Sequence, residues 1–378
     1  MMMQRSQMMN GVGIMDETHL KALNQTLVSF ENIHHKYGKI TSVEDISFQI
    51  QHGEIVSLLG PSGCGKTTML RLAAGFETPS AGHITKNSIQ ISSPDDMLLP
   101  EHRNMGLVFQ SYALFPHMTV EQNVAFGIKP DQHQEKAQKQ RVADILNELD
   151  VLEYASCYPH ELSGGQQQRV AVARAIAPSP DLILFDEPYS GLDSRLRERV
   201  RDRMLHILKS EKIAALIVTH DAEEAMFMSD KIIVLNDGRM MQQGRPIDLY
   251  CRPENAFVAE FFGEVNQIPA TGTGDGKIKS IFGQFDAPSI EKGQNAVMIL
   301  RYEGINVHTQ SETAVKGEVM STHLLGRYTL VHVEIRKPDS NIDLHLHARL
   351  PGLNFLHPGQ DVFIEIDPSQ AFIFPASM

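Results

Sequence analysis

Short apolar runs alternate with helical patterns over residues 28–262. Three of these runs are short and rich in leucine or β-branched residues, as buried parallel strands are: 54–59, 181–185 and 212–219. Strands that alternate with helices predict an α/β domain with a parallel sheet. Between about residues 116 and 160 the pattern becomes polar and helical, most clearly over 134–149, which predicts a helical subdomain within the α/β domain.

After residue 262 the hydrophobic period changes to two. Residues 266–280 include Pro269 and three glycines, and we expect them to form a linker. Beyond them, apolar and polar residues alternate in three runs: 328–335, 344–350 and 361–367. Several short alternating strands within about a hundred residues predict a small β barrel or sandwich over 263–378.

Residues 1–27 are rich in methionine, glutamine and asparagine. They lack the continuous apolar stretch of a signal peptide, so we expect a disordered N-terminal extension. No apolar run approaches the roughly eighteen residues of a spanning helix. Three cysteines at irregular spacing, Cys64, Cys157 and Cys251, match neither a disulfide framework nor a zinc pattern, which favours a reducing, cytoplasmic environment.

Acidic residues outnumber basic residues, 46 to 34, and the net charge is −12. General nucleic-acid binders usually carry a basic surface, so this balance argues against nucleic acid as a partner. Nucleotide binding remains compatible with it, because a few local dipoles and cations suffice to hold phosphates.

The run 54–59 is followed directly by the pattern G-x-x-x-x-G-K-[ST], and a helical pattern follows at 68–74. Glycines in such a loop let backbone N–H groups face nucleotide phosphates, and the helix N-terminus adds a positive dipole end. Lys66 is expected to pair with β- and γ-phosphate oxygens, and Thr67 to bind Mg²⁺ through its hydroxyl. The residues predicted to contact ATP here are Gly60, Pro61, Ser62, Gly63, Cys64, Gly65, Lys66, Thr67 and Thr68.

The phosphate loop alone fits a kinase, a GTPase or an ATPase, and a second motif narrows the choice. The apolar run 182–185 ends in Asp186 and Glu187, as a Walker B strand does. Asp186 is expected to hold Mg²⁺ through its water shell. The adjacent Glu187 is expected to orient or deprotonate the attacking water.

A third motif consists of Leu162, Ser163, Gly164, Gly165 and Gln166, and a helical run follows it. Ser163 and the two glycines again form a helix N-terminus suited to an anion. A second phosphate-binding helix end is unusual for a monomer with one site, but it is explained if Ser163 completes the site of another subunit. With this motif, the sequence resembles the ABC transporter ATPase family.

The resemblance implies a P-loop RecA-like core with a helical subdomain, and a head-to-tail homodimer that holds two ATP molecules with Mg²⁺. Tyr37 fits the aromatic residue that stacks on adenine, Gln110 the glutamine that contacts Mg²⁺ and senses the membrane partner, and His220 the histidine that hydrogen-bonds the γ-phosphate. Asp193 fits the loop that crosses to the partner subunit. The catalytic residues implied in this way are Lys66, Glu187 and His220.

The ABC family includes importer ATPases, ATPases that act on DNA, and translation factors. DNA-acting members carry a long coiled coil or zinc motifs within the cassette, and the translation factors carry two cassettes; this sequence has none of these features. Residues 109–124 and the C-terminal β domain resemble importer ATPases with a TOBE regulatory domain of the oligosaccharide-binding (OB) type. A non-transport ATPase acting on DNA remains the alternative from another class.

Four stretches look most similar to ferric-iron importers: 158–169, 180–193, 256–263 and 325–331. The resemblance therefore implies Fe³⁺ import, with a polyamine, a phosphonate or another small solute as the alternative cargo. It also implies separate membrane permease subunits and a periplasmic solute-binding protein that selects the cargo. The ATPase would then be peripheral, on the cytoplasmic face of the inner membrane.

The C-terminal domain contains His323, His332, His345 and His347. Two interpretations are open: a regulatory metal site, or polar residues on the solvent face of alternating strands. Fe³⁺ favours oxygen ligands over neutral imidazole, and alternation by itself predicts polar residues at these positions. We therefore expect the solvent-facing arrangement.

Overall fold

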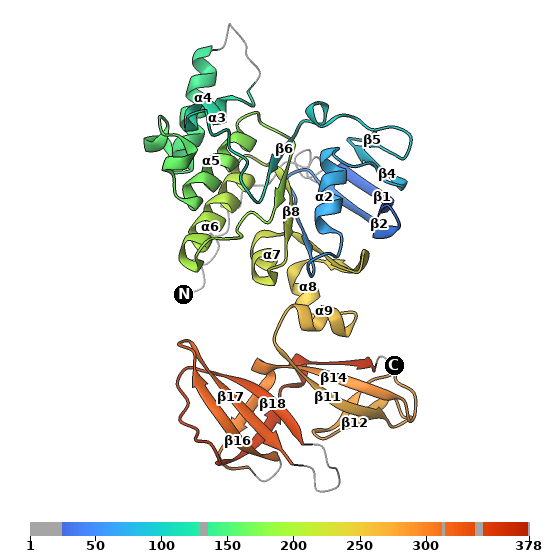
Figure 1. Cartoon of the computed structure of the whole chain (residues 1–378). Helices are drawn as coiled ribbons and strands as arrows, with labels where there is room; N and C mark the ends of the chain where they lie inside the picture. Colours follow the sequence, from blue (N-terminus) through green and yellow to red (C-terminus); the bar gives the residue numbers. More distant parts are fainter. Residues whose placement is uncertain (1–24, 129–134, 312–313, 337–342, 377–378) are drawn as a thin grey trace, which may run out of the picture. The chain divides into compact units, whose positions relative to one another are not determined.

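The computed structural model describes residues 25–128, 135–311, 314–336 and 343–376. The chain divides into two compact units, Met1–Pro246 and Ile247–Met378 (Figure 1). The α/β core and the β-rich C-terminal domain expected from the sequence are both confirmed. Among the described residues, no helix has both the length and the apolar content needed to cross a membrane.

A six-stranded sheet forms the centre of the first unit. In pairing order its strands are β10 (Arg239–Gly244), β9 (Lys231–Asn236), β3 (Ile55–Leu59), β8 (Ala214–Thr219), β7 (Leu182–Asp186) and β6 (Met105–Val108). β10 is antiparallel to β9, and the other neighbours are parallel. Every residue of β3 and β8 is buried, as expected for central strands covered on both faces. The three predicted strands are thus confirmed as β3, β7 and β8.

Alternate residues of these strands build two separate cores. Ile183 and Phe185 of β7 pack with α5 (Gly164–Ile176) and α6 (Ser194–Ser210) on one face. Leu182 and Leu184 pack on the other face with α2 (Lys66–Ala74) and a four-stranded antiparallel sheet. Figure 1 accordingly shows α5 and α6 on one side of the six-stranded sheet and α2 on the other. The strands of the smaller sheet pair in the order β2 (Ile40–Gln51), β1 (Thr26–Tyr37), β4 (Ala81–Lys86) and β5 (Ile89–Ser92).

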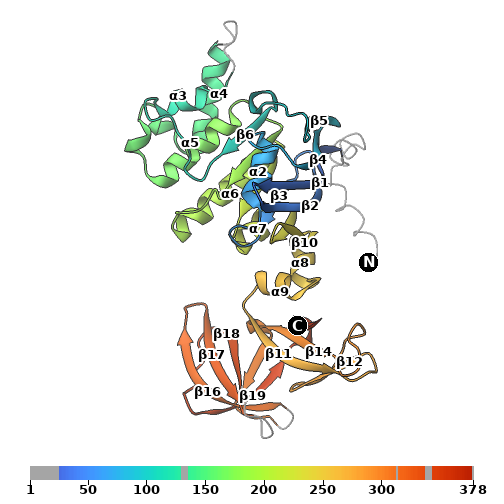
Figure 2. The ribbon, with the colours of Figure 1, turned by 45° about the vertical axis from the view of Figure 1, so that its right-hand side comes forward.

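A group of helices lies between β6 and β7 in the chain: α3 (Val120–Ala125), α4 (Glu135–Glu148) and α5. Figure 2 shows these three helices together beside β6. The helix predicted at 134–149 is confirmed as α4, which buries Val142, Ile145 and Leu146 at the spacing of one helix face. The buried amide of Asn123 accepts from the Phe115 N–H at 2.8 Å and donates to the Phe115 carbonyl at 3.1 Å. This side chain therefore fixes the segment that follows β6 against α3.

The second unit contains α8 (Pro246–Cys251), α9 (Ala256–Phe261) and two five-stranded antiparallel sheets. One sheet pairs β13 (Gly283–Asp286), β12 (Lys277–Ser280), β11 (Val265–Gly272), β14 (Asn295–Arg301) and β20 (Ala371–Pro375) in that order. The other pairs β15 (Ile305–His308), β19 (Asp361–Ile366), β16 (Val315–Leu324), β17 (Tyr328–Ile335) and β18 (Leu344–Pro351). The alternation predicted over 328–335 is confirmed, because the buried residues of β17 are Thr329, Val331, Val333 and Ile335.

The linker predicted at 266–280 is wrong. These residues supply β11 and β12, and β11 lies between β12 and β14 in its sheet. Pro269 is tolerated in β11 because β12 pairs only with Thr271 and Gly272, so no neighbour on that side requires an N–H from Pro269. Proline and glycine content was therefore a misleading signal here.

The boundary between the units also differs from the expected change at residue 262, because α8 and α9 belong to the second unit. The guanidinium of Arg301 explains the association: it stacks 3.6 Å from the ring centroid of Tyr250 and donates to the Tyr250 carbonyl at 2.8 Å. Arg301 is almost fully buried, so α8 is needed to cover it. The expected extension 1–27 lies outside the described residues up to residue 24, and β1 begins at Thr26.

Candidate nucleotide site

The loop 60–65 joins β3 directly to α2. Gly65 is the N-cap of α2 and has a φ of 101°, a left-handed conformation that favours glycine. A Cβ atom at Gly65 would lie 2.6 Å from the carbonyl oxygen of Ser42, so a side chain would not fit. No side chain of the described residues caps the first turn of α2. Its N–H groups are therefore suited to a phosphate.

Lys66 lies within this loop. Its ammonium is buried and donates to the carbonyl oxygens of Gly60 and Pro61, at 2.8 Å each. It also lies 3.8 Å from the Sγ of Cys64. Burial raises the pKa of the Cys64 thiol, and the charge of Lys66 only partly offsets that effect. Cys64 is therefore a protonated, buried thiol in the wall of the loop.

Thr67 and Asp186 bring two kinds of oxygen together. The Thr67 hydroxyl, in the first turn of α2, lies 3.4 Å from Oδ1 of Asp186 at the end of β7. Burial raises the pKa of Asp186, and the neighbouring charge of Glu187 raises it further. Hydroxyl and carboxylate oxygens are ligands that Mg²⁺ accepts, with phosphates and water completing the shell. The pair is thus compatible with the predicted Mg²⁺ site.

Glu187 connects the ends of three parallel strands. Its Oε1 lies 3.2 Å from Nδ1 of His220, which follows β8, and its Oε2 accepts from Gln110, which follows β6, at 3.4 Å. Its own N–H donates to the Val218 carbonyl at 2.9 Å. Glu187 also has a φ of 46°, a left-handed conformation that costs a non-glycine residue about 1–3 kcal/mol. The fold therefore holds this carboxylate in a defined position at the carboxyl edge of the sheet, where ligands of α/β proteins bind.

Tyr37 belongs to the hairpin formed by β1 and β2. It is at the end of β1, half exposed, and pairs with Ile40 in the turn that leads to β2. Two residues later, the Ser42 hydroxyl lies 2.7 Å from the Thr68 hydroxyl in α2. The ring of Tyr37 is therefore on the strand hairpin that contacts the phosphate loop.

The third motif lies elsewhere in the unit. Ser163 and Gly164 are exposed at the start of α5, and the Gln166 side chain accepts from the Ser163 N–H at 2.7 Å. Since α5 and α2 pack on opposite faces of the six-stranded sheet, the two predicted phosphate-binding helices do not share a face. Asp193 caps α6 by accepting from the Leu196 N–H at 3.0 Å.

Two side chains near His220 were missed by the sequence analysis. Arg197 of α6 lies 3.8 Å from Glu224 of α7 (Ala222–Met228) and 3.4 Å from Asp221, the residue after His220. The sequence shows an arginine four residues after Asp193 and acidic residues, including Asp221 and Glu224, just after His220, but nothing in it indicates that these side chains meet. Their meeting depends on the packing of α6 against α7, which no local pattern specifies.

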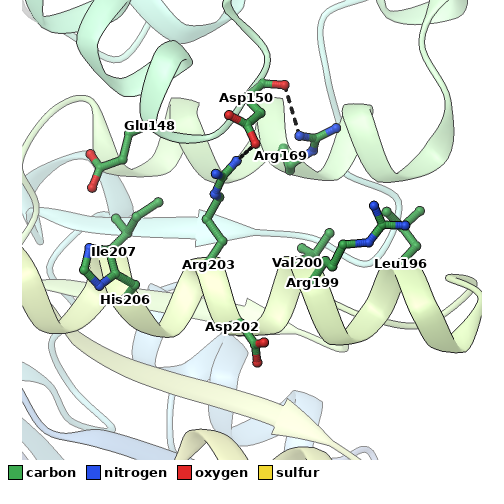
Figure 3. Close-up of a pocket in the computed structure, with 10 residues that line it drawn as sticks. All are labelled: Glu148, Asp150, Arg169, Leu196, Arg199, Val200, Asp202, Arg203, His206 and Ile207. Atoms are coloured by element: carbon green, nitrogen blue, oxygen red, sulfur yellow. Dashed lines mark hydrogen bonds and ion pairs between the residues drawn. The ribbon is translucent and has the colours of Figure 1, made fainter.

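A cleft of about 630 Å³ lies between α6 and the α4–α5 region, but it is not the predicted site (Figure 3). None of its lining residues belongs to the three motifs. Arg203 of α6 forms an ion pair with Asp150, and Arg169 of α5 donates to the Asp150 carbonyl at 3.0 Å. These contacts hold α6 against the end of α4. We interpret the cleft as a gap in the packing between α6 and the α4–α5 helices, not as a ligand site.

The four histidines of the second unit lie on strands β16, β17 and β18. The rings of His332 and His347 are 4.1 Å apart between centroids, and those of His323 and His332 are 5.7 Å apart. Burial and the neighbouring histidines lower the pKa of His332. Among the described residues, no cluster of three or more histidine, cysteine or acidic side chains has the arrangement of a metal site.

Comparison with known proteins places these features in context. The ABC transporter family matches residues 43–190, and the TOBE domain matches residues 298–374. The Fe(3+) ions import ATP-binding protein FbpC of Fusobacterium nucleatum is 36% identical over 353 residues, which covers 92% of this chain and 93% of that protein. The spermidine/putrescine import ATP-binding protein PotA of Chromobacterium violaceum is 38% identical over 328 residues, covering 82% and 88%.

Two solved structures are similar to part of this chain. The ATP-binding cassette MJ0796, determined as a dimer bound to ADP and Pi, is 31% identical with a TM-score of 0.52, covering 58% of this chain and 99% of that one. CbiO1 from Clostridium perfringens, part of the transporter complex CbiONQ, is 27% identical with a TM-score of 0.55, covering 61% and 92%.

Proposed function

We propose that this chain, which belongs to the ABC transporter ATPase family and ends in a TOBE domain, is the ATP-hydrolysing subunit of an Fe³⁺ importer. Its membership of the import ATPases rests on the long matches to FbpC and PotA. The observation that carries the catalytic proposal is the position of Glu187, between Gln110 and His220 at the strand ends beside the Lys66 loop.

ATP is the substrate of the proposed site. Its phosphates would lie against the loop 60–67, with Lys66 transferring its hydrogen bonds from the Gly60 and Pro61 carbonyls to the β- and γ-phosphates. Adenine stacked on Tyr37 would lie beside them, since that hairpin contacts α2 through Ser42 and Thr68. Base–aromatic stacking contributes about 1–3 kcal/mol in nucleic-acid complexes, and we expect the same order here.

Thr67 and Asp186 would hold Mg²⁺, with Gln110 as a further oxygen donor. When bound, the cation neutralises charge on the phosphates during phosphoryl transfer. Glu187 would accept the proton of the attacking water, and His220 would hydrogen-bond the γ-phosphate. Glu187 contacts both Gln110 and His220, so movement of either neighbour changes the orientation of the base.

We further propose a head-to-tail homodimer in which Ser163 of each subunit closes the ATP site of the other. Two observations support it: α2 and α5 pack on opposite faces of the sheet, and the similar cassette MJ0796 was determined as a dimer. The Leu162–Gln166 motif would thus contact the partner's ATP, and Asp193 would lie in the loop that crosses to the partner subunit.

The remaining partners follow from the import function. We propose membrane permease subunits as the direct partner and a periplasmic solute-binding protein as the source of cargo. The ATPase would be a peripheral protein on the cytoplasmic face of the inner membrane. Nucleic acid is not among the proposed partners, and the net charge of −12 supports this.

Fe³⁺ is the proposed cargo, and a polyamine is the second candidate because PotA proteins are about as similar as FbpC proteins. The test is uptake of labelled Fe³⁺ and labelled spermidine by cells that lack this subunit, then by cells carrying the wild type or Glu187→Gln. We expect iron uptake to disappear on deletion and to return only with the wild type. Loss of spermidine uptake with normal iron uptake would show that the cargo is a polyamine and not Fe³⁺, and it would leave the ATPase assignment intact.

Binding at the loop can be tested through Cys64. With Mg-ATP at about a hundred times its Kd, alkylation of Cys64 is expected to slow by up to about a hundredfold, because only unoccupied sites react. Cys157 and the exposed Cys251 are the internal controls and should react at unchanged rates. Mass spectrometry after timed quenching measures all three. An unchanged rate at Cys64 under saturating Mg-ATP would contradict phosphate binding at this loop.

A further inference from the structure

Arg197 contacts two segments that have different roles in the proposed function: the loop 190–193, which faces the partner subunit, and the segment after His220. It lies in the first turns of α6, directly after the loop 190–193. Its Nη2 donates to the Leu192 carbonyl at 3.2 Å, and its Nη1 lies 3.4 Å from Oδ2 of Asp221. Its Nε lies 3.8 Å from Oε1 of Glu224. One guanidinium thus contacts the loop before α6 and the start of α7.

The two carboxylates that Arg197 contacts, Asp221 and Glu224, follow His220 in the chain by one and four residues. Glu224 is buried, and its Oε2 accepts from the Thr219 hydroxyl at 2.7 Å. The same hydroxyl accepts from the Asp221 N–H at 3.0 Å, and Oδ1 of Asp221 accepts from the Glu224 N–H at 3.1 Å. Thr219 and Asp221 are the residues on either side of His220. The backbone that carries the histidine is therefore held by a closed set of hydrogen bonds.

Arg197 supplies the positive charge that this set requires. Burial raises the pKa of Glu224, while the Thr219 hydrogen bond and the charge of Arg197 oppose that effect. The planar guanidinium donates to the Leu192 carbonyl and lies close to two carboxylates on a second segment, which a lysine ammonium on a single stem would not match. Removing one partner of a partly buried charged network is costly, because the carboxylates that remain are left unpaired.

We propose that Arg197 is a positioning residue that couples the loop 190–193 to the orientation of His220. This inference rests on the proposed function, in which Asp193 lies at the partner subunit and His220 acts on the γ-phosphate. A displacement of the loop when two subunits close would move the Leu192 carbonyl, Arg197 and the Asp221–Glu224 pair together. His220 and the Glu187 carboxylate that it contacts at 3.2 Å would then adopt their catalytic positions only in the closed dimer.

The first test uses the full chain and three single variants. Arg197→Gln is expected to lower kcat for ATP by about ten- to a hundredfold, the cost of a misplacement of about 1 Å near the chemistry. The KM for ATP should change by less than about threefold, because the phosphate loop is untouched. Arg197→Lys should be intermediate. Arg203→Gln is the matched control: it removes another guanidinium and an ion pair from α6, but on the Asp150 side (Figure 3), and should retain wild-type kcat.

A double-mutant cycle with His220→Ala separates positioning from a general structural effect. If Arg197 acts through His220, then Arg197→Gln should lower kcat by less than about twofold in the His220→Ala background, measured by single-turnover hydrolysis. An equal loss in both backgrounds, or wild-type kcat in Arg197→Gln, would overturn the inference while leaving the roles of His220 and Glu187 intact. Wild-type kcat in His220→Ala would instead remove the proposed catalytic role and the inference with it.

Glu224→Gln covers the case in which Arg197→Gln fails to fold. The glutamine keeps an oxygen for the Thr219 hydroxyl but removes the charge that faces Arg197. The expected result is a loss of kcat in the same direction, with the same lack of additivity towards His220→Ala. Wild-type kcat in this variant would contradict the coupling.

Discussion

Replacing Glu187 with glutamine is expected to lower the ATP turnover rate by about a hundredfold or more while ATP still binds, as loss of a general base does. Glutamine has the same shape and keeps an oxygen for the Gln110 amide, so the strand ends should keep their arrangement. It cannot accept the proton of the attacking water. Chains that bind ATP and do not hydrolyse it should accumulate as dimers. Phosphate release measures the turnover, and sedimentation velocity on the same sample measures the fraction of dimer.

The matched control is Glu223→Gln. Glu223 is an exposed carboxylate in the first turn of α7, three residues from His220 and outside the contacts of Glu187. The Glu223→Gln substitution removes the same charge from the same region and should leave ATP turnover unchanged. Near-normal turnover in Glu187→Gln would remove this carboxylate from the mechanism. A monomer that persists with bound ATP would argue instead against a dimer as the ATP-bound state.

Much of the fold could be predicted because its signals are local. The motif from Gly60 to Thr67 lies between an apolar run and a helical pattern, and both became regular elements, β3 and α2. Asp186 ends β7 and Glu187 follows it, and the four residues before them, Leu182–Phe185, are all buried and carry a continuous apolar signal. Parallel strands place their carboxyl ends at one edge, which is why Gln110, Glu187 and His220 meet although they are far apart in sequence.

The errors in the second unit arose where tertiary contacts override local composition. Pro269 and three glycines are typical of a linker, yet β11 pairs with β14 along seven residues from Val265 to Thr271. The packing of Arg301 against Tyr250 likewise assigns α8 to the second unit. Neither partner of that contact carries a sequence signal, because stacking depends on residues about fifty positions apart.

The site was incomplete for the same reason. Sequence motifs identify residues expected to touch ATP, since the spacing of those residues is set by the loop itself. Arg197 and Glu224 act through their neighbours, and their relation depends on how α6 and α7 pack. The backbone conformation of Glu187 also follows from tertiary contacts, because its N–H bonds to Val218 on the neighbouring strand. Residues of this kind become visible only in three dimensions.

Mixing two inactive variants is expected to restore ATPase activity if the two subunits share each site. A Lys66→Ala chain lacks the ammonium of its own phosphate loop, and a Ser163→Arg chain blocks the helix end offered to its partner. In a heterodimer both lesions fall in one site, and the other site is intact. With random pairing, half of the dimers are mixed and each has one of two sites, so about a quarter of wild-type turnover should return if the sites act independently.

The control pairs Lys66→Ala with Glu187→Gln, two lesions that the structure places at the same end of the six-stranded sheet in one chain. Each site of that heterodimer carries one lesion, so no activity should return. Differently tagged chains purified in sequence establish that mixed dimers form, and single-turnover hydrolysis counts their active sites. Two outcomes would contradict a site that Ser163 completes across the dimer. One is that purified Lys66→Ala/Ser163→Arg heterodimers contain no active site, and the other is that activity returns in the control pair.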